Sequence, residues 1–145
     1  MKIKFKTRKQ GTMYYPTFII GINPGRPSKT QRSFLTWTGP RGASLVQKAL
    51  DGLPNLYFTN VFNWYVHPKH DVKKLIQQGI EELKQDIERY HPVKMVCLGN
   101  FVYNVIDDLC LHETTVIKLP HPSYVFRFKK NHRQYTQRLR KAVTS

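Results

Sequence analysis

The sequence predicts a single α/β domain of three layers, in which a central, mainly parallel sheet of four strands lies between helices. Apolar runs rich in β-branched residues alternate with segments of helical periodicity along the 145 residues, a pattern typical of parallel sheets with right-handed crossovers. The length suits one domain, and no low-complexity linker or internal repeat divides the chain. We therefore treat residues 1–145 as one domain, with a basic N-terminal arm at about residues 1–12 and a basic C-terminal helix at about residues 131–143.

Each expected strand is a short apolar run that stops at a glycine, a proline or a polar residue. The expected strands cover residues 18–20, 56–61, 93–98 and 114–119. Gly21 and Gly99 end the first and third of them, and Pro120 follows the fourth. The second strand carries Asn60 near its end.

The expected helices are separated from the strands by turn residues. They cover residues 44–50, 72–90, 100–109 and 132–143. Asp51-Gly52 ends the first helix, and Asp71 is a suitable N-cap for the second, whose apolar residues recur at spacings of three and four. Residues 26–42 and 63–70 are polar or rich in Gly and Pro, which predicts loops.

Charge is segregated along the chain. The net charge is +15, yet residues 1–50 and 114–145 contain no Asp or Glu, and all nine acids lie within residues 51–113. A basic surface concentrates polyanions and binds them by releasing counterions. The alternative is a generic basic surface that favours solubility. Because the acid-free segments are long, the pattern favours a polyanionic partner.

Several other classes of protein lack support in the sequence. No run of 18 apolar residues suggests a membrane span, and the basic N-terminus has no apolar stretch behind it, as a secretory signal would. Cys97 and Cys110 lie in apolar surroundings, so we expect reduced core residues of a cytoplasmic, or nucleoid-associated, protein. No metal-ligand spacing, phosphate-binding loop or serine nucleophile elbow is present. We expect neither a metal nor a cofactor.

Polar turns follow three of the expected strands. Asn23 lies in the turn after the first strand, Asn60 at the end of the second, and His121 in the turn after the fourth. Ligands of parallel sheets bind beyond the carboxyl ends of the strands. The sequence therefore predicts that these three side chains face one crevice.

Four motifs, in chain order, resemble those of the uracil-DNA glycosylase superfamily. They are GINPG (21–25), TNVFNW (59–64), VCLGN (96–100) and LPHPS (119–123). GINPG is similar to the first motif of the mismatch-specific uracil/thymine branch, whereas WTGPRG (37–42) and HPSYVFR (121–127) are similar to the thermostable bacterial and archaeal branch. Two features depart from that second branch: two cysteines cannot supply the ligands of its iron–sulfur cluster, and the first motif lacks a carboxylate.

The resemblance implies that Asn23 and His121 are catalytic. An amide is no base, but the Asn23 carbonyl can hold a water and aim it at the sugar C1′. Neutral His121, or a backbone N–H of its turn, can donate to the pyrimidine O2 as negative charge develops, and nearby cations would lower the histidine pKa. Without a carboxylate the chain forgoes general-base help, which is worth ~10²–10⁴-fold. The alternatives are turn chemistry for Asn23 and a structural cap for His121.

The resemblance also implies the base-binding residues. Asn60 would pair with O4 and N3–H of uracil, although a strand-end Asn can instead form an Asx turn. Trp37 or Phe34 would stack on the extruded base, although either ring can belong to the core. In the strictest uracil-specific branch of the superfamily, a Tyr at the position of Gly25 closes the pocket against a 5-methyl group. Glycine leaves space there, so thymine mismatches and 5-modified pyrimidines are alternative substrates. Ile22, beside Asn23, is counted with the base-binding residues.

The DNA-binding residues follow from the two basic segments and the HPSYVFR run. Tyr124 and Phe126 are candidates for the wedge that fills the space left by the extruded base, and packing onto the sheet is the alternative for Val125 or Phe126. The expected phosphate contacts are Ser28, Lys29, Ser123, Arg127, Lys129, Lys130 and Arg133.

The predicted function is that of a monomeric, monofunctional DNA glycosylase that flips uracil out of DNA and hydrolyses its N-glycosidic bond. DNA, single- or double-stranded, is the predicted partner. The alternative from another class is a DNA-binding module on the same fold that has lost activity, which the missing carboxylate favours.

Overall fold

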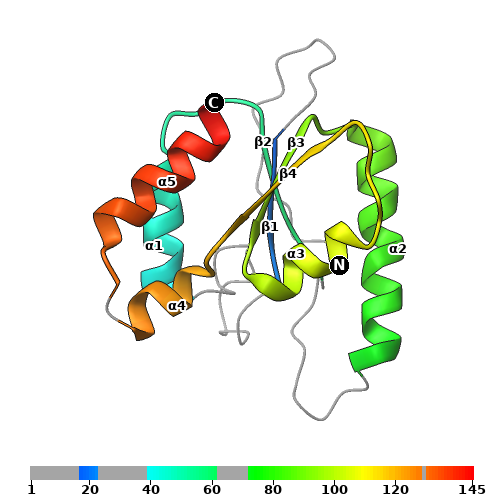
Figure 1. Ribbon diagram of the computed structural model, residues 1–145, viewed down its shortest axis with the longest axis horizontal. Helices are drawn as coiled ribbons and strands as arrows, with labels where there is room; N and C mark the ends of the chain where they lie inside the picture. Colours follow the sequence, from blue (N-terminus) through cyan, green and yellow to red (C-terminus); the bar gives the residue numbers. More distant parts are fainter. Residues whose placement is uncertain (1–16, 23–38, 62–71, 129) are drawn as a thin grey trace.

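Four short parallel strands form the centre of the protein. The structure is a computed structural model that describes residues 17–22, 39–61, 72–128 and 130–145. The strands are β1 (Thr17–Gly21), β2 (Leu56–Asn60), β3 (Lys94–Leu98) and β4 (Thr115–Leu119). They pair in the order β2-β1-β3-β4, and every pairing is parallel (Figure 1). The sheet expected from the sequence is thus confirmed, and it is wholly parallel rather than mainly parallel.

Helices cover both faces of the sheet. They are α1 (Gly39–Leu50), α2 (Val72–Tyr90), α3 (Asn100–Asp107), α4 (Pro122–Arg127) and α5 (His132–Thr144). Helices α1, α4 and α5 lie together on one side of the strands, and α2 and α3 lie on the other (Figure 1). The α/β domain therefore has the three layers that the sequence predicts.

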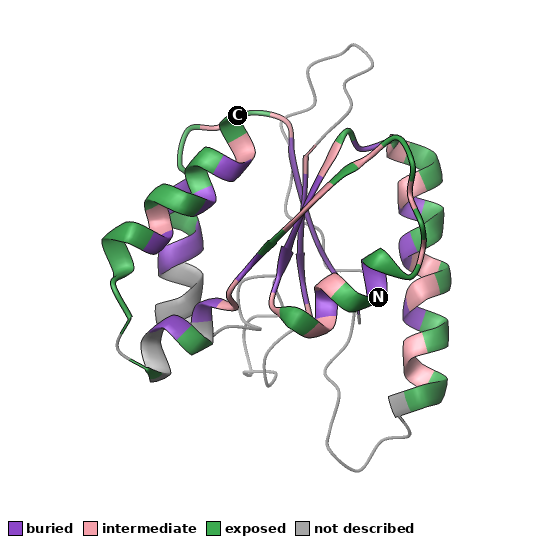
Figure 2. Ribbon diagram, viewed as in Figure 1, coloured by how far each residue is buried: buried purple, intermediate pink, exposed green. Residues whose placement is uncertain are grey.

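Two apolar cores lie on the two faces of the sheet, and residues of β1 alternate between them. Ile19 packs with the α1 and α5 side, whereas Phe18 and Ile20 pack with the α2 and α3 side. This alternation follows from the two-residue period of a strand. All three side chains are fully buried, and the purple strands of Figure 2 show the same burial along the middle of the sheet.

Two helical segments differ from the prediction. Helix α1 begins at Gly39, within the segment expected to be loop, because a proline such as Pro40 is tolerated in the first turn of a helix. Helix α4 was not predicted, because His-Pro-Ser was interpreted only as a turn, whereas a proline at the first helical position favours a helix start. The other elements agree to within three residues at each end.

The two cysteines differ in environment. Cys97 is buried in β3, as expected, but Cys110 is exposed beyond the end of α3, so the prediction of a core residue is wrong for Cys110. Both thiols are free. Burial raises the pKa of Cys97 to about 12, which keeps that thiol protonated. Within the described ranges, no helix has the length and apolar character to cross a membrane.

Helix α5 is capped at its start and bonded to the end of α1 in its last turns. The Asn131 side chain caps its start by accepting the Gln134 N–H at 3.0 Å. Farther along, Arg140 Nη1 donates to the carbonyls of Ala49 (3.2 Å) and Asp51 (3.1 Å), which close the end of α1. These contacts hold α5 against α1 and thereby fix the basic helix beside the turn that contains His121.

Candidate functional site

The carboxyl ends of the four strands lie at the same rim of the sheet. Gly21 at the end of β1 is in register with Asn60 at the end of β2, and the Val61 N–H donates to the Gly21 carbonyl at 3.0 Å. On the other side, the Gly99 N–H donates to the Leu119 carbonyl at 2.7 Å. The residues that follow all four strands therefore share one edge.

Asn60 ends β2 and His121 comes shortly after β4, and these are the two outer strands of the sheet. Strands β1 and β3 lie between them, so β2 and β4 are three strand spacings apart, about 14 Å in a flat sheet. Strand β1 leads into the turn that contains Asn23, which lies outside the described residues. Asn60 and His121 thus lie at the same rim of the sheet. The expectation that their side chains face one crevice together with Asn23 stays a prediction.

The side chain of Asn60 is buried without a hydrogen-bond partner. Asn60 is 1% exposed, and neither its Nδ2 nor its Oδ1 has a partner among the residues that the structure describes. An unsatisfied buried amide costs about 1–3 kcal/mol, and native proteins seldom carry one without a use. The amide offers both a donor and an acceptor, which is what recognition of a pyrimidine edge requires.

His121 is held in the turn between β4 and α4. Its carbonyl accepts the N–H groups of Tyr124 (3.0 Å) and Val125 (3.4 Å), so His121 caps the first turn of α4. The hydroxyl of buried Tyr135 donates to the Pro120 carbonyl at 2.7 Å, and this bond fixes the turn from the α5 side. The structural cap and the catalytic role expected of His121 are therefore compatible.

Burial sets the charge of His121. It lowers the pKa of the imidazole from its ordinary value of 6.5 to about 4, so the ring is neutral at neutral pH. The sequence predicted a neutral ring on the ground of nearby cations. The direction is confirmed, but the physical cause is desolvation. A neutral imidazole can donate one hydrogen bond without placing a full charge beside the base.

A cavity of about 490 Å³ opens beside His121. Besides His121, its lining includes the turn after β3, the end of β4 and two basic side chains: Gly99, Asn100, Lys118, Leu119, Pro120, Tyr124 and Arg138. Lys118 and Arg138 come from β4 and α5, and both are exposed. Two cations and a neutral imidazole around one cavity suit a ligand that carries negative charge.

The family comparison agrees with this geometry. The model of the uracil DNA glycosylase superfamily matches residues 10–143. This chain belongs to the uracil DNA glycosylase superfamily. A comparison with curated proteins finds no match. Because the superfamily acts on DNA, membership supports DNA as the partner and base excision as the class of reaction.

Several site residues that the superfamily resemblance implies fall outside the described residues. They are Asn23, Gly25, Ser28, Lys29, Phe34, Trp37 and Lys129. Ser123, Phe126 and Arg127 belong to α4, but the placement of their side chains is not described. Ile22 is half-buried and packs against the core on the α2 and α3 side. The roles assigned to these residues remain predictions.

Other predicted DNA contacts lie on the described surface of this superfamily member. Tyr124 is 44% exposed on α4, while neighbouring Val125 is 2% exposed and packs into the core, as its alternative assignment expected. Lys130 and Arg133 are exposed at the start of α5. Lys118 and Arg138 were not singled out from the sequence, although the acid-free segment 114–145 that contains them gave the signal.

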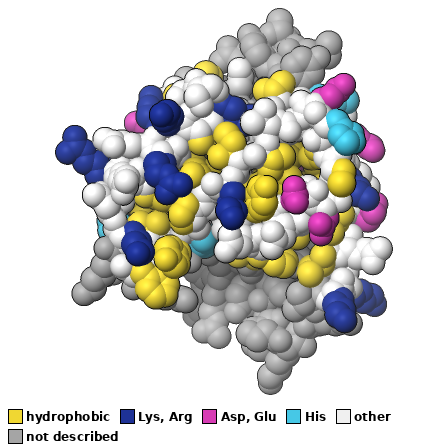
Figure 3. Space-filling model, viewed as in Figure 1, with side chains coloured by type: hydrophobic (Ala, Val, Ile, Leu, Met, Phe, Trp, Pro, Cys, Tyr) yellow, Lys and Arg dark blue, Asp and Glu magenta, His cyan; other side chains and the backbone are white. Residues whose placement is uncertain are grey.

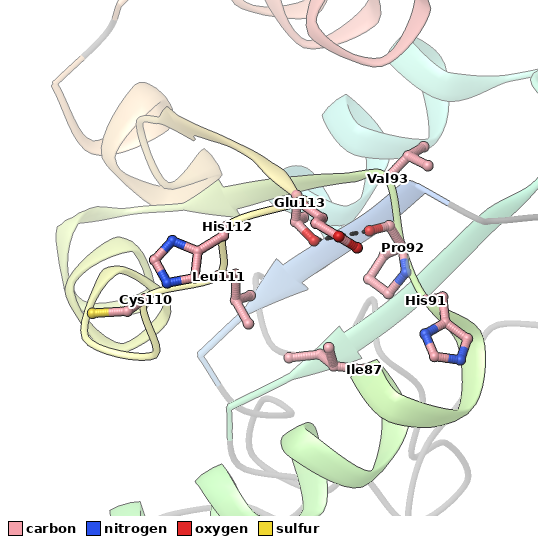
Figure 4. Close-up of a pocket in the computed structure, with 9 residues that line it drawn as sticks. Ile87, His91, Pro92, Val93, Cys110, Leu111, His112 and Glu113 are labelled. Carbon is pink, nitrogen blue, oxygen red and sulfur yellow. Dashed lines mark hydrogen bonds between the residues drawn. The ribbon is translucent and has the colours of Figure 1, made fainter.

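A second cavity lies at the opposite, amino-terminal end of β3 and β4. It has about 690 Å³ and is lined by Ile87, His91, Pro92, Val93, Cys110, Leu111, His112, Glu113 and Thr114 (Figure 4). His91 and His112 lie on different sides of it, and no metal-binding group of His, Cys, Asp or Glu occurs among the described residues. Because this cavity is remote from the superfamily motifs at the carboxyl rim, we do not assign it to the site.

Proposed function

We propose that this chain is a monofunctional DNA glycosylase that excises uracil and leaves an abasic site. The proposal depends mainly on the buried Asn60 amide, which has no hydrogen-bond partner among the described residues and lies at the rim that also holds neutral His121. Together with superfamily membership, this pair supports a pocket that binds one pyrimidine. We also propose that the protein acts as a monomer in the cytoplasm or on the nucleoid.

The proposed reaction is hydrolysis of the bond between C1′ and the base nitrogen. As that bond breaks, the base gains negative charge and the sugar becomes an oxocarbenium-like cation. His121 donates a hydrogen bond to the pyrimidine O2, and Asn60 pairs with the O4 and N3–H edge. The Asn23 carbonyl orients the water whose oxygen bonds to C1′. The proton that this water loses neutralises the departing uracil anion, so the products are free uracil and the abasic sugar.

Abasic-site formation on a uracil-containing oligonucleotide tests the proposal. The informative variant is Asn60→Leu, which keeps the volume but removes both hydrogen-bonding groups. We expect kcat/KM to fall about 30–150-fold, since two hydrogen bonds of about 1–1.5 kcal/mol each are lost. The melting temperature should stay equal or rise, because a buried amide that has no partner in the described part of the chain is gone. Thr59→Val, the neighbouring buried position on the opposite strand face, is the control and should retain activity.

The catalytic pair is tested in the same assay. Asn23→Ala and His121→Ala should each reduce turnover severely while DNA affinity barely changes, because the lysine and arginine contacts to phosphate remain. Thymine opposite guanine and 5-substituted pyrimidines form the substrate panel for the alternatives that Gly25 suggests. Excision of one of those bases in preference to uracil would replace the substrate. Tight DNA binding with no abasic site on any base would mean an inactive binding module.

A further inference from the structure

Two aromatic rings are exposed side by side next to the candidate site. Tyr124 is 44% exposed and Phe128 is 55% exposed, and their ring centroids lie 4.7 Å apart with an angle of 44° between the planes. Among the described residues, Val93 is the other large hydrophobic side chain with comparable exposure. An exposed pair of large rings is unusual on a surface that has no partner, and such patches mark binding sites.

The backbone of α4 holds this pair in place. The Phe128 N–H donates to the Tyr124 carbonyl at 3.0 Å, so the two rings are one helical turn apart. Between them in sequence, Val125 is buried in the core, and its carbonyl accepts the Lys130 N–H at 2.9 Å. Buried Val125 therefore anchors this turn to the core, while the two rings are exposed to solvent. A preorganised surface loses little conformational entropy when a ligand binds.

Positive charge surrounds the rings. Lys130 Nζ lies 5.9 Å from the Tyr124 ring centroid, and Tyr124 shares the His121 cavity with Lys118 and Arg138. Figure 3 shows hydrophobic side chains beside Lys and Arg on the α4 and α5 side of the molecule, whereas most of the acids in this view lie on the opposite side. Aromatic faces bordered by cations fit a ligand that combines flat rings with negative charge. A nucleic-acid strand has this combination.

We propose that Tyr124 and Phe128 form a stacking platform for unpaired bases that flank the extruded nucleotide. This inference rests on the proposed function, because that function is what places a DNA strand beside His121. Stacking requires an open base face, which an unpaired strand offers and an intact duplex hides between neighbouring pairs. The platform therefore gives the enzyme a preference for single-stranded DNA. A wedge would act differently, because it fills a gap in a duplex and contributes only where a duplex is present.

Binding to DNA without a target base tests the platform separately from catalysis. Fluorescence anisotropy would measure Kd for a uracil-free single strand and for a hairpin duplex, in wild type, Phe128→Leu, Phe128→Tyr and Tyr124→Leu. Leucine keeps an apolar side chain and removes the ring, whereas Phe128→Tyr keeps the ring. The control is Val93→Ala, which truncates an exposed apolar residue at the opposite end of the sheet. Far-UV circular dichroism and thermal melting would verify the fold of each variant.

We expect Phe128→Leu and Tyr124→Leu each to weaken single-strand binding at least about fivefold, the low end of the contribution of one stacked base. Hairpin binding should change less than about twofold, since it rests on phosphate contacts. Phe128→Tyr should bind the single strand as wild type does, and Val93→Ala should change neither affinity. Equal losses on both substrates, a larger loss on the hairpin, or no loss would each overturn the platform.

Base excision provides the independent reading of the proposed function. If the wild-type protein forms no abasic site on any pyrimidine, and the Phe128→Leu variant binds single strands more weakly, the glycosylase is refuted and the platform is supported. Wild-type protein that excises uracil, with no selective effect of Phe128→Leu, would support the glycosylase and refute the platform.

Discussion

Gly99 packs directly against His121. A Cβ atom placed on Gly99 would lie 3.4 Å from the His121 Cβ and 3.9 Å from its Cδ2. Gly99 also has a φ of +102°, a conformation that side-chain-bearing residues rarely adopt. The turn after β3 thus forms the back wall for the histidine that follows β4, and its shape depends on the absence of a side chain.

Replacing Gly99 by alanine should therefore affect both stability and catalysis. Backbone strain at this φ should lower the free energy of unfolding by about 1–3 kcal/mol. The new methyl group would touch His121 at an ordinary van der Waals distance, so the strained backbone is what would shift the turn behind the imidazole. If His121 has the proposed catalytic role, a displacement of a fraction of an ångström should lower kcat about tenfold or more. Urea denaturation and single-turnover excision would measure the two effects.

Gly52→Ala is the matched control. Gly52 also has a positive φ, +78°, but a Cβ there would meet nothing within 4 Å. Its alanine variant should lose stability through backbone strain and keep the wild-type kcat. If the two variants had the same kcat, the contact between Gly99 and His121 would have no part in positioning the imidazole.

The lowered pKa of His121, about 4, predicts how stability depends on pH. The unfolded chain binds a proton at this residue near pH 6.5, while the folded protein keeps the ring neutral down to about pH 4. The contribution of the neutral ring is complete above pH 6.5 and is lost as the pH falls from 6.5 to 4, because protonation favours the unfolded chain. Denaturation midpoints at pH 7.5 and 4.5 should differ less in His121→Gln than in wild type.

The same shift predicts the pH profile of excision. Turnover in single-turnover experiments should show no His121 inflection near pH 6.5, since the folded ring is already neutral there. A fall in rate centred at pH 6.5 that disappears in His121→Gln would show that the imidazole titrates as it does in water. That result would remove burial as the cause of its neutral state.

The strand ends were predictable from the sequence, whereas the surface around them was not. Gly21, Asn60 and Gly99 end or follow apolar runs, and a parallel sheet necessarily brings such positions to one rim. The convergence of Lys118 and Arg138 at the His121 cavity depends instead on how α5 docks against α1, α4 and β3. That docking is a long-range packing outcome with no periodic signature of its own.

Two local misreadings have a common physical cause. Pro40 and Pro122 both occur in the first turns of helices, where the missing N–H is not needed, yet proline within a polar run was interpreted as loop or turn.

Cys110 lies just past α3 with a positive φ of 52°, where its side chain is exposed. Its apolar neighbours in sequence gave no indication of that turn.

A buried polar pair stabilises the side of the sheet that α2 covers. The Tyr57 hydroxyl donates to Asp86 Oδ2 at 3.0 Å, and both residues are at most 3% exposed. Burial, together with the adjacent carboxylate, raises the pKa of Tyr57, so the phenol remains a donor. Tyr57→Phe should lower the free energy of unfolding by about 1–3 kcal/mol, because the buried carboxylate loses a donor.

Tyr103→Phe is the control for that substitution. Tyr103 is half-buried, and its ring lies 5.2 Å from Lys118 Nζ, a contact that phenylalanine retains. Chemical denaturation should show a change below about 0.5 kcal/mol for this variant. Both variants should excise uracil at the wild-type rate per folded molecule. An equal loss of stability in the two would mean that the Tyr57 hydroxyl contributes no more than a phenol at the surface.

Arg133 tests whether DNA lies over the start of α5. Arg133 is the second residue of α5, and it is exposed within the acid-free segment. Lys84 is exposed on α2 beside Glu81, with 3.8 Å between the Lys84 Nζ and the Glu81 Oε1. Arg133→Gln and Lys84→Gln each remove one positive charge, so they change the net charge equally. If a phosphate contacts Arg133, only its variant should reduce the slope of log Kd against log salt concentration, by about 0.7–0.9. Fluorescence anisotropy titrations at salt concentrations from about 50 to about 200 mM would determine the slope for each variant. Equal slopes in the two variants would show that attraction to DNA depends on total charge rather than on a contact at α5.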